Sequence, residues 1–185
     1  MARISVEMRE VLTVRGKRDQ QTVTPEGRTV APRIAGATVR PAVTLPDERG
    51  EICEILNPAW GVSEAPIVYV YQASVRPGRI KGWVYHLEQE DRIFVSMGAL
   101  KIVLYDLRDD SPTAGMINEI HLSERNRGLL VIPRRVAHAV ENVGETEALF
   151  INMPTRPYNH QNPDKYRIPI DSGEIPYSFD RGPDR

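Results

Sequence analysis

Residues 128–142, with the sequence GLLVIPRRVAHAVEN, decide the fold class of this chain. An apolar run at 129–132 ends at Pro133, and a second candidate strand, which mixes apolar and polar residues, follows at 137–142. Proline cannot donate a hydrogen bond to a sheet, so it separates two short runs of strand-forming residues. The stretch therefore predicts two strands joined by a turn, with His138 on the second strand.

The same pattern continues on both sides of this stretch. Short β-branched and aromatic runs alternate with turn residues such as Gly98, Ser111-Pro112 and Gly144, which suit the tight connections of an antiparallel sheet. Helical periodicity is missing, so the sequence predicts an all-β barrel or sandwich. The predicted strands are residues 67–73, 82–87, 92–96, 100–107, 116–122, 129–132, 137–142 and 148–152.

The segments that flank these strands differ in composition from them. Residues 1–44 carry eight basic and four acidic side chains among several prolines, and we expect an N-terminal arm that adds a strand or extends loosely. Residues 45–180 are the predicted domain, and its proline-rich end should wrap over the barrel, docked through apolar side chains as far as about Phe179. Residues 181–185 are expected to be a short tail.

Composition restricts the class of protein. The chain has 185 residues, of which 41% are hydrophobic and 26% charged, which suits one globular domain. A net charge of -1 gives no overall field to attract nucleic acid or an anionic membrane. The single cysteine, Cys53, rules out an internal disulfide, and no apolar run approaches the roughly 18 residues of a membrane-spanning helix. We expect a cytoplasmic protein that binds neither nucleic acid nor membrane.

Residues 128–142 resemble the second conserved motif of the cupin superfamily, and this resemblance implies a cupin-type jelly-roll barrel. In the same register, the positions of the first cupin motif are held by Val84, His86 and Asp91, among others. Residues 84 and 86 share one face of a strand, so His86, Asp91 and His138 would meet inside the barrel. Two imidazoles and one carboxylate are the donor set of a non-haem iron site, with Glu88 as a substitute for Asp91. The two histidines are alternatively hydrogen-bonded pocket residues without a metal.

A more extensive resemblance, over about residues 45–180, is to the dTDP-4-dehydrorhamnose 3,5-epimerase family. It implies a jelly-roll barrel, a homodimer with shared strands, a pocket for a nucleoside diphosphate sugar, and no cofactor. The resemblance rests on several short blocks in the correct order: Asp47-Glu48-Arg49-Gly50, Lys81-Gly82, Asp106-Leu107-Arg108, Ser111-Pro112-Thr113, Leu122-Ser123-Glu124, Val131-Ile132-Pro133, Ala137-His138 and Pro154-Thr155-Arg156-Pro157-Tyr158.

The resemblance also implies a reaction, in which a proton next to a keto group is removed and returned on the opposite face. That reaction needs a general base, a general acid and a group that stabilises the enolate. By resemblance the base position is Val84, the acid position is Phe150 and the position of a supporting lysine is Asp91. The carboxylate that orients the base should lie near Asp171 or Ser172, with Asp171 as the candidate. Three of these positions therefore lack the expected chemistry.

Nearby residues offer a substitute set. His86 lies one pleat from the base position on the same face and is the hypothetical base, with Asp91 or Glu88 to orient it. Tyr158 or Tyr85 is the hypothetical acid.

Residues for substrate binding follow from the same resemblance. Arg49 matches a position associated with the nucleotide diphosphate, and Lys81 should lie near the mouth of the same pocket. Gln72 matches another polar contact, and His138 points into the pocket.

Three functions from different classes remain open at this point. The first is an epimerase or isomerase that acts on a 4-keto-6-deoxy sugar nucleotide with an altered acid/base set and no cofactor. The second is a metal-dependent cupin enzyme that binds iron or another divalent transition metal through His86, Asp91 and His138. The third is a nucleotide-sugar binding protein without catalysis.

Overall fold

The computed structural model describes residues 19–26 and 29–179. The chain divides into two compact units, residues 1–32 and 33–185. In the first unit an isolated antiparallel bridge joins Val23 to Thr29, and the described residues are almost all exposed. Within the described part of the chain, no helix is long and apolar enough to cross a membrane.

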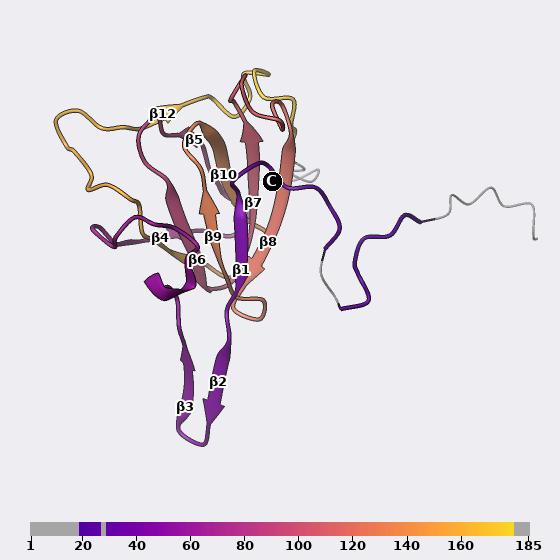
Figure 1. The fold of residues 1–185 in the computed structure, drawn as a ribbon, viewed down its shortest axis with the longest axis vertical. Helices are drawn as coiled ribbons and strands as arrows, with labels where there is room; N and C mark the ends of the chain where they lie inside the picture. Colours follow the sequence, from indigo (N-terminus) through magenta and orange to yellow (C-terminus); the bar gives the residue numbers. More distant parts are fainter. Residues whose placement is uncertain (1–18, 27–28, 180–185) are drawn as a thin grey trace, which may run out of the picture. The chain divides into compact units, whose positions relative to one another are not determined.

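The second unit is built from two five-stranded antiparallel sheets and one separate hairpin (Figure 1). The first sheet has the order β1 (Thr38–Pro41), β9 (Gly128–Ile132), β6 (Asp91–Met97), β11 (Ala148–Asn152) and β4 (Tyr71–Val75). The second has the order β12 (Tyr166–Arg167), β5 (Ile80–Tyr85), β10 (Val136–Asn142), β7 (Ala99–Asp106) and β8 (Ile117–Ser123). The hairpin pairs β2 (Thr44–Asp47) with β3 (Gly50–Cys53), and one 3-10 helix spans Pro58–Trp60.

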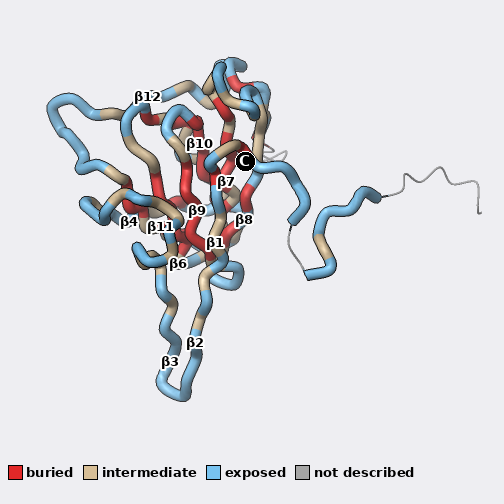
Figure 2. Tube along the Cα trace, in the orientation of Figure 1, coloured by how far each residue is buried: buried red, intermediate tan, exposed pale blue. Residues whose placement is uncertain are grey.

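The main core lies between the two sheets and takes side chains from both. Alternate residues of each strand point inward, as the two-residue period of a strand requires. Examples are Ile93 and Val95 of β6, and Leu100, Ile102 and Leu104 of β7, all of which are almost completely buried. The strongest burial follows the central strands (Figure 2).

The outer faces of both sheets are covered as well. On the second sheet, Trp83 of β5 packs with Ile175 and Phe179 of the C-terminal segment. On the first sheet, Phe94 and Leu129 pack with Met153 and with partly buried residues of 42–62, including Cys53. Strands buried on both faces are apolar at almost every position, which explains the continuous runs that the sequence contains.

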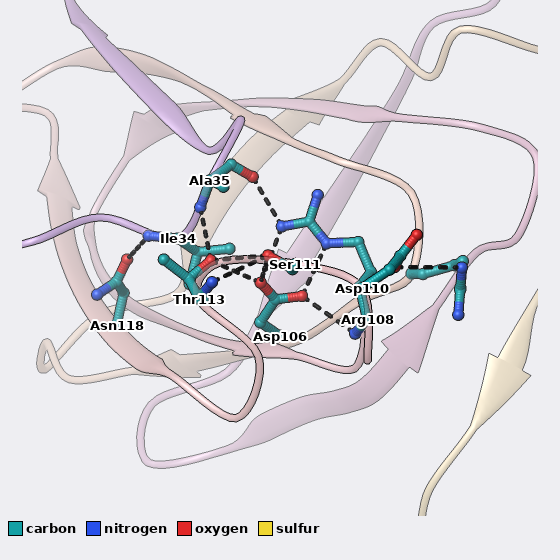
Figure 3. Close-up of polar contacts among 9 residues, drawn as sticks. Ile34, Ala35, Asp106, Arg108, Asp110, Ser111, Thr113 and Asn118 are labelled. Atoms are coloured by element: carbon teal, nitrogen blue, oxygen red, sulfur yellow. Dashed lines mark hydrogen bonds and ion pairs between the residues drawn. The ribbon is translucent and has the colours of Figure 1, made fainter.

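A buried carboxylate anchors the start of the domain. The side chain of Asp106, at the end of β7, accepts hydrogen bonds from Arg108, Ser111 and Thr113 (Figure 3). Arg108 also donates to the Ala35 carbonyl, and Thr113 Oγ1 accepts from the Ala35 backbone nitrogen at 2.9 Å. This network ties the turn after β7 to the chain segment that precedes β1.

The prediction of an all-β jelly roll is confirmed, and each of the eight predicted strands overlaps an observed one. The largest shift is in β4, which begins at Tyr71, four residues after the predicted start. The predicted boundary after residue 44 lies inside the second compact unit, which begins at residue 33. The reason is that β1 pairs with β9 of the same chain, so part of the predicted arm is a strand of the domain. The predicted tail at 181–185 lies outside the described residues.

Candidate active site

A cavity of about 370 Å³ opens at one end of the inner core, between the two sheets. Apolar residues form part of its wall, and charged or hydrogen-bonding side chains form the rest. That combination is typical of small-molecule sites. The lining residues are Tyr71, Ala73, Ile80, Lys81, Gly82, Val84, His86, Asp91, Ile93, His138, Val140, Phe150, Asn152, Lys165 and Arg167.

Two adjacent strands of the second sheet carry the histidines. His138 of β10 pairs with Val84 of β5, and His86 follows directly after β5 on the same inward face as Val84. Gly82 permits this close pairing, because a Cβ atom there would lie 2.5 Å from the Cβ of Ala139 and 2.9 Å from the His138 carbonyl. The strand spacing at Gly82 therefore sets the position of His138.

His86, Asp91 and His138 form a buried cluster on the cavity wall. Oδ2 of Asp91 lies 3.4 Å from Nε2 of His86 and 3.3 Å from Nε2 of His138. The three side chains come from both sheets, since Asp91 begins β6. Their ligand atoms lie within 4.8 Å of one another, and the three residues are buried.

Backbone carbonyls contact the other ring nitrogen of each histidine. Nδ1 of His86 contacts the carbonyl oxygen of Asp164, and Nδ1 of His138 lies 3.4 Å from the Val136 carbonyl. A carbonyl accepts only, so the contact at His86 assigns a proton to Nδ1 and leaves Nε2 as the nitrogen that faces Asp91. At 3.4 Å the contact between Nε2 and Asp91 is too long for a strong hydrogen bond.

The cluster shifts the pKa of two of its members. Burial alone would raise the pKa of Asp91, but the adjacent His138 and His86, which in their protonated forms can donate to it and carry positive charge, hold it well below its usual range. Burial opposes protonation of His86, but Asp91 and Asp164 outweigh burial and raise its pKa. Asp91 is therefore an ionised carboxylate beside two imidazoles.

Asp164 also fixes the loop between His86 and Asp91. Its carboxylate accepts hydrogen bonds from the backbone nitrogens of Leu87, Glu88 and Gln89 at 2.8–3.1 Å. The side chain of Gln89 donates to Oδ1 of Asp91 at 3.0 Å. The carboxylate of Asp91 is thus held with its other oxygen toward the histidines.

The wall of the first sheet carries a tyrosine that the sequence analysis did not select. Tyr71 of β4 lies opposite Asn152 of β11, and Asn152 Nδ2 donates to the Tyr71 hydroxyl at 2.9 Å. Burial, followed by the charge of Asp91, raises the pKa of Tyr71 to about 12. The phenol therefore keeps its proton at neutral pH.

Three cationic side chains line the same cavity: Lys81, Lys165 and Arg167. Burial, together with Arg167 and Lys81, lowers the pKa of Lys165. A group of cations beside a small cavity is suited to a phosphate or carboxylate of the ligand.

The structure brings four of the eight predicted site residues together: His86, Asp91, His138 and Lys81 all line the cavity. Tyr158 lies in a neighbouring hollow of about 310 Å³, which shares Tyr71, His86 and Lys165 with the cavity.

The remaining predicted residues lie elsewhere in the described chain. Gln72 is exposed on β4 between the lining residues Tyr71 and Ala73, so it belongs to the opposite face of that strand. Arg49 lies in the turn of the β2–β3 hairpin, where it is 81% exposed and pairs with Asp47. Asp171 lines a separate hollow with Gly173 and Tyr177.

Glu88 and Tyr85, which the sequence offered as an alternative carboxylate and an alternative acid, also point away from the cluster. Glu88 is 61% exposed and forms an ion pair with Arg156. Tyr85 stacks on Tyr166 and packs with the outer core of the second sheet, near Trp83.

Comparison with known proteins decides the family of this chain. The model of the dTDP-4-dehydrorhamnose 3,5-epimerase family matches residues 32–177. The chain belongs to this family. It is therefore a carbohydrate epimerase-like enzyme with the cupin-type barrel that the sequence predicted.

Two relatives and one solved structure illustrate the extent of the similarity. The probable low-salt glycan biosynthesis epimerase Agl13 of Haloferax volcanii is 33% identical over 141 residues, 76% of this chain and 90% of the relative. The spore coat polysaccharide biosynthesis protein SpsL of Bacillus subtilis is 36% identical over 149 residues, 79% of this chain and 96% of the relative. A dTDP sugar isomerase from Desulfovibrio desulfuricans superposes with a TM-score of 0.73 at 29% identity, over 78% of this chain and 91% of that protein.

Four polar residues that line the cavity of this epimerase-family member were not predicted from the sequence: Tyr71, Asn152, Lys165 and Arg167. The alternation of strand residues could have identified Tyr71, because it shares the parity of Ala73 and Val75, which point into the core. The two cations follow 13 and 15 residues after the end of β11, so only the tertiary course of the C-terminal segment brings them to the cavity.

Proposed function

We propose that this enzyme epimerises a 4-keto-6-deoxy sugar nucleotide in the barrel cavity, by removing a proton from a carbon next to the keto group. The observation that carries the proposal is the buried cluster of His86, Asp91 and His138 on the wall of a cavity whose lining also includes three cations. The cluster is suited to proton transfer, and the cations are suited to a diphosphate. A cavity of about 370 Å³ suits a ligand part of the size of one hexose ring.

His86 is the proposed base. The contact of its Nδ1 atom with the Asp164 carbonyl leaves Nε2 to accept the substrate proton. The ionised carboxylate of Asp91, at 3.4 Å from that atom, then stabilises the imidazolium that forms. This arrangement compensates for Val84, which lines the same wall but cannot accept a proton.

Substrate binding is assigned to the mouth of the cavity. Lys81, Lys165 and Arg167 would pair with the diphosphate, and His138 would contact the sugar beside the reacting carbon. The neighbouring hollow, lined by Tyr69, Tyr158 and other residues, offers aromatic surface for the nucleoside.

The experiment that tests this function uses solvent deuterium. The protein is incubated in D₂O with dTDP-4-keto-6-deoxyglucose, and the mass of the sugar nucleotide is followed. Incorporation of one or two deuterons at carbons next to the keto group is the expected result. A sugar that gains no deuterium, although thermal shift shows that dTDP stabilises the protein, would instead favour binding without catalysis.

A second candidate function is a metal-dependent enzyme, and one observation favours it. Metal bonds of about 2.1 Å at angles of 90–110° place two donors roughly 3.0–3.4 Å apart. The two separations between Asp91 and the histidines are 3.4 and 3.3 Å, and both Nδ1 atoms face carbonyls, as in many metal-bound histidines. Metal analysis of the native protein separates the two candidate functions. One transition-metal ion per chain supports the metal-dependent enzyme, whereas deuterium exchange into the keto sugar by metal-free protein supports the epimerase.

A homodimer is part of the same proposal. The β2–β3 hairpin and the residue before it expose large apolar side chains, with Val43 and Leu45 each 64% and Ile52 69% exposed. Exposed apolar side chains that cluster on one element are typical of a protein interface. Sedimentation of the wild-type protein beside a Leu45→Glu, Ile52→Glu variant tests it, with a dimer expected for the former and a monomer for the latter.

A further inference from the structure

The side-chain amide of Asn152 has one fixed orientation. Asn152 is 1% exposed, and its Oδ1 atom accepts a hydrogen bond from the backbone nitrogen of Arg92 at 3.1 Å. The reverse orientation would set the NH₂ group against that N–H, with two donors facing each other. The NH₂ group must therefore point toward Tyr71, to which it donates at 2.9 Å.

This orientation determines what the Tyr71 hydroxyl can do. A phenol has one proton to donate and lone pairs to accept. Because Asn152 donates to the oxygen of Tyr71, the proton of that hydroxyl is left for another acceptor. Within residues 19–26 and 29–179, Tyr71 donates to no protein group, and its side chain lines the cavity. The proton is thus available to a bound ligand.

Tyr71 and His86 belong to opposite walls of the cavity. Tyr71 and Asn152 lie on β4 and β11 of the first sheet, whereas His86 and His138 belong to the chain of β5 and β10 in the second sheet. Inversion at a carbon requires that a proton leave one face and return on the other. A sugar ring held between the two sheets would present one face to each group.

Among the described residues that line the cavity, Tyr71 is the one aromatic side chain with a hydroxyl. Phe150 lines the cavity beside Tyr71 but has no polar atom. Tyr71 and Tyr158 are similarly exposed, at 36% and 42%, but Tyr158 lines the neighbouring hollow and not the cavity, and Tyr85 stacks on Tyr166.

We infer that Tyr71 is the acid that returns the proton to the substrate, and that Asn152 is its positioning residue. The inference rests on the proposed function, because it names the group that completes the same reaction. The O–H bond of Tyr71 breaks as the new C–H bond forms, and the enolate becomes the ketone again. The His86 imidazolium then gives up the proton that it removed, and the Tyr71 phenolate takes up a proton, both through solvent water.

The test is a comparison of two rates, deuterium exchange and inversion, in the variant Tyr71→Phe. This change removes only the hydroxyl. Exchange is expected to continue within a few-fold of the wild-type rate, because His86 still removes the proton and returns a deuteron to the same face. Inversion is expected to fall by about 10²- to 10⁴-fold, the usual contribution of a general acid.

Ser74→Ala is the matched control. Ser74 lies on β4 with Tyr71, and the change also removes only a hydroxyl, but Ser74 lines neither the cavity nor the neighbouring hollow. Both rates should stay at the wild-type level in this variant, so a loss caused by general disturbance of β4 would be recognised.

Asn152→Asp tests the positioning role with almost no change in shape. The carboxylate can still accept from Arg92, but it would now also accept from Tyr71 and draw the phenolic proton away from the cavity. Inversion should fall as in Tyr71→Phe, while KM changes little. Wild-type inversion by Tyr71→Phe would overturn this inference alone, whereas absence of exchange in the wild-type protein would overturn the proposed function as well.

Discussion

Nε2 of His86 lies 3.4 Å from Oδ2 of Asp91, while the other ring nitrogen of His86 contacts the Asp164 carbonyl. One imidazole is thereby held between a backbone carbonyl and a buried carboxylate, with its basic nitrogen on the cavity wall. The first prediction follows from this pair of residues.

Asp91→Asn is expected to slow deuterium exchange by about 10²- to 10⁴-fold, since the imidazolium that forms on His86 loses its counter-charge. The measurement is the initial rate of deuterium incorporation into the keto-sugar nucleotide. Asp109→Asn is the control, because Asp109 is exposed after β7. A wild-type rate in the Asp91 variant would remove this carboxylate from the mechanism.

Substitution of the cations that line the cavity should weaken nucleotide binding without changing the rate at which bound substrate reacts. Lys165→Ala and Arg167→Ala are each expected to raise the Kd for dTDP by roughly tenfold, which corresponds to one lost charged hydrogen bond. Isothermal titration gives the Kd, and Arg125→Ala, in the exposed turn after β8, is the control. Unchanged affinity in both cavity variants would move the diphosphate to another part of the protein.

Gly82→Ala should destabilise the wall that carries His138. The new methyl group would meet Ala139 and the His138 carbonyl, and the backbone at Gly82 has φ +147. We expect a loss of about 3 kcal/mol in the free energy of unfolding, from overpacking and backbone strain together. Denaturant titration measures it, with Gly115→Ala as the comparison.

At Gly115 φ is +75, but no atom lies within 4 Å of the added Cβ. The loss there should be only about 1 kcal/mol. Equal losses at the two glycines would mean that the close approach of β5 and β10 is unimportant for stability.

Asp106→Asn tests the anchor drawn in Figure 3, and its effect should depend on pH. Burial opposes ionisation of Asp106, but hydrogen bonds from Arg108, Ser111 and Thr113 outweigh it and hold the pKa well below its usual range. A depressed carboxyl pKa adds stability that is complete above the unfolded value of about 3.9 and is lost as the pH falls toward the folded value.

The variant should therefore be less stable than the wild-type protein by about 2–4 kcal/mol at pH 7, with a deficit that shrinks below about pH 4. Urea titrations at pH 7, 5, 4 and 3 measure it. Asp110→Asn is the control, since Asp110 is 83% exposed and lies 3.9 Å from its partner Arg135. A deficit that is constant down to pH 3 would contradict the assignment.

The sequence predicted the central strands well because both faces of these strands are covered. Residues of β9 and β10 are buried throughout, so β9 is apolar along its length and β10 is apolar except at His138, Glu141 and Asn142. The sequences of β1 and β2, TVRP and TLPD, contain proline and polar residues and lie at sheet edges or in the hairpin. Their pairing depends on contacts with distant segments, which local patterns do not encode.

The candidate site was predictable where strand alternation applies. The parity of residues 84 and 86 correctly predicted that His86 points inward, where it lines the cavity with His138. The prediction that Gln72 lies in the site was wrong, because strand alternation gives the inward positions to its neighbours Tyr71 and Ala73. Asp164, which precedes Lys165, accepts a hydrogen bond from the backbone of Glu88 and so holds Lys165 near the cavity. No local sequence pattern predicts such a long-range contact.

The measurement that tests the central claim most directly is deuterium exchange by metal-free wild-type protein beside metal-free His86→Gln. Proton NMR of dTDP-4-keto-6-deoxyglucose in D₂O follows the hydrogens next to the keto group. The account predicts that their signals disappear with the wild-type protein and persist about 10²- to 10⁴-fold longer with the variant. Equal loss of signal with both proteins, or no loss with either, would contradict the claim that His86 removes the proton.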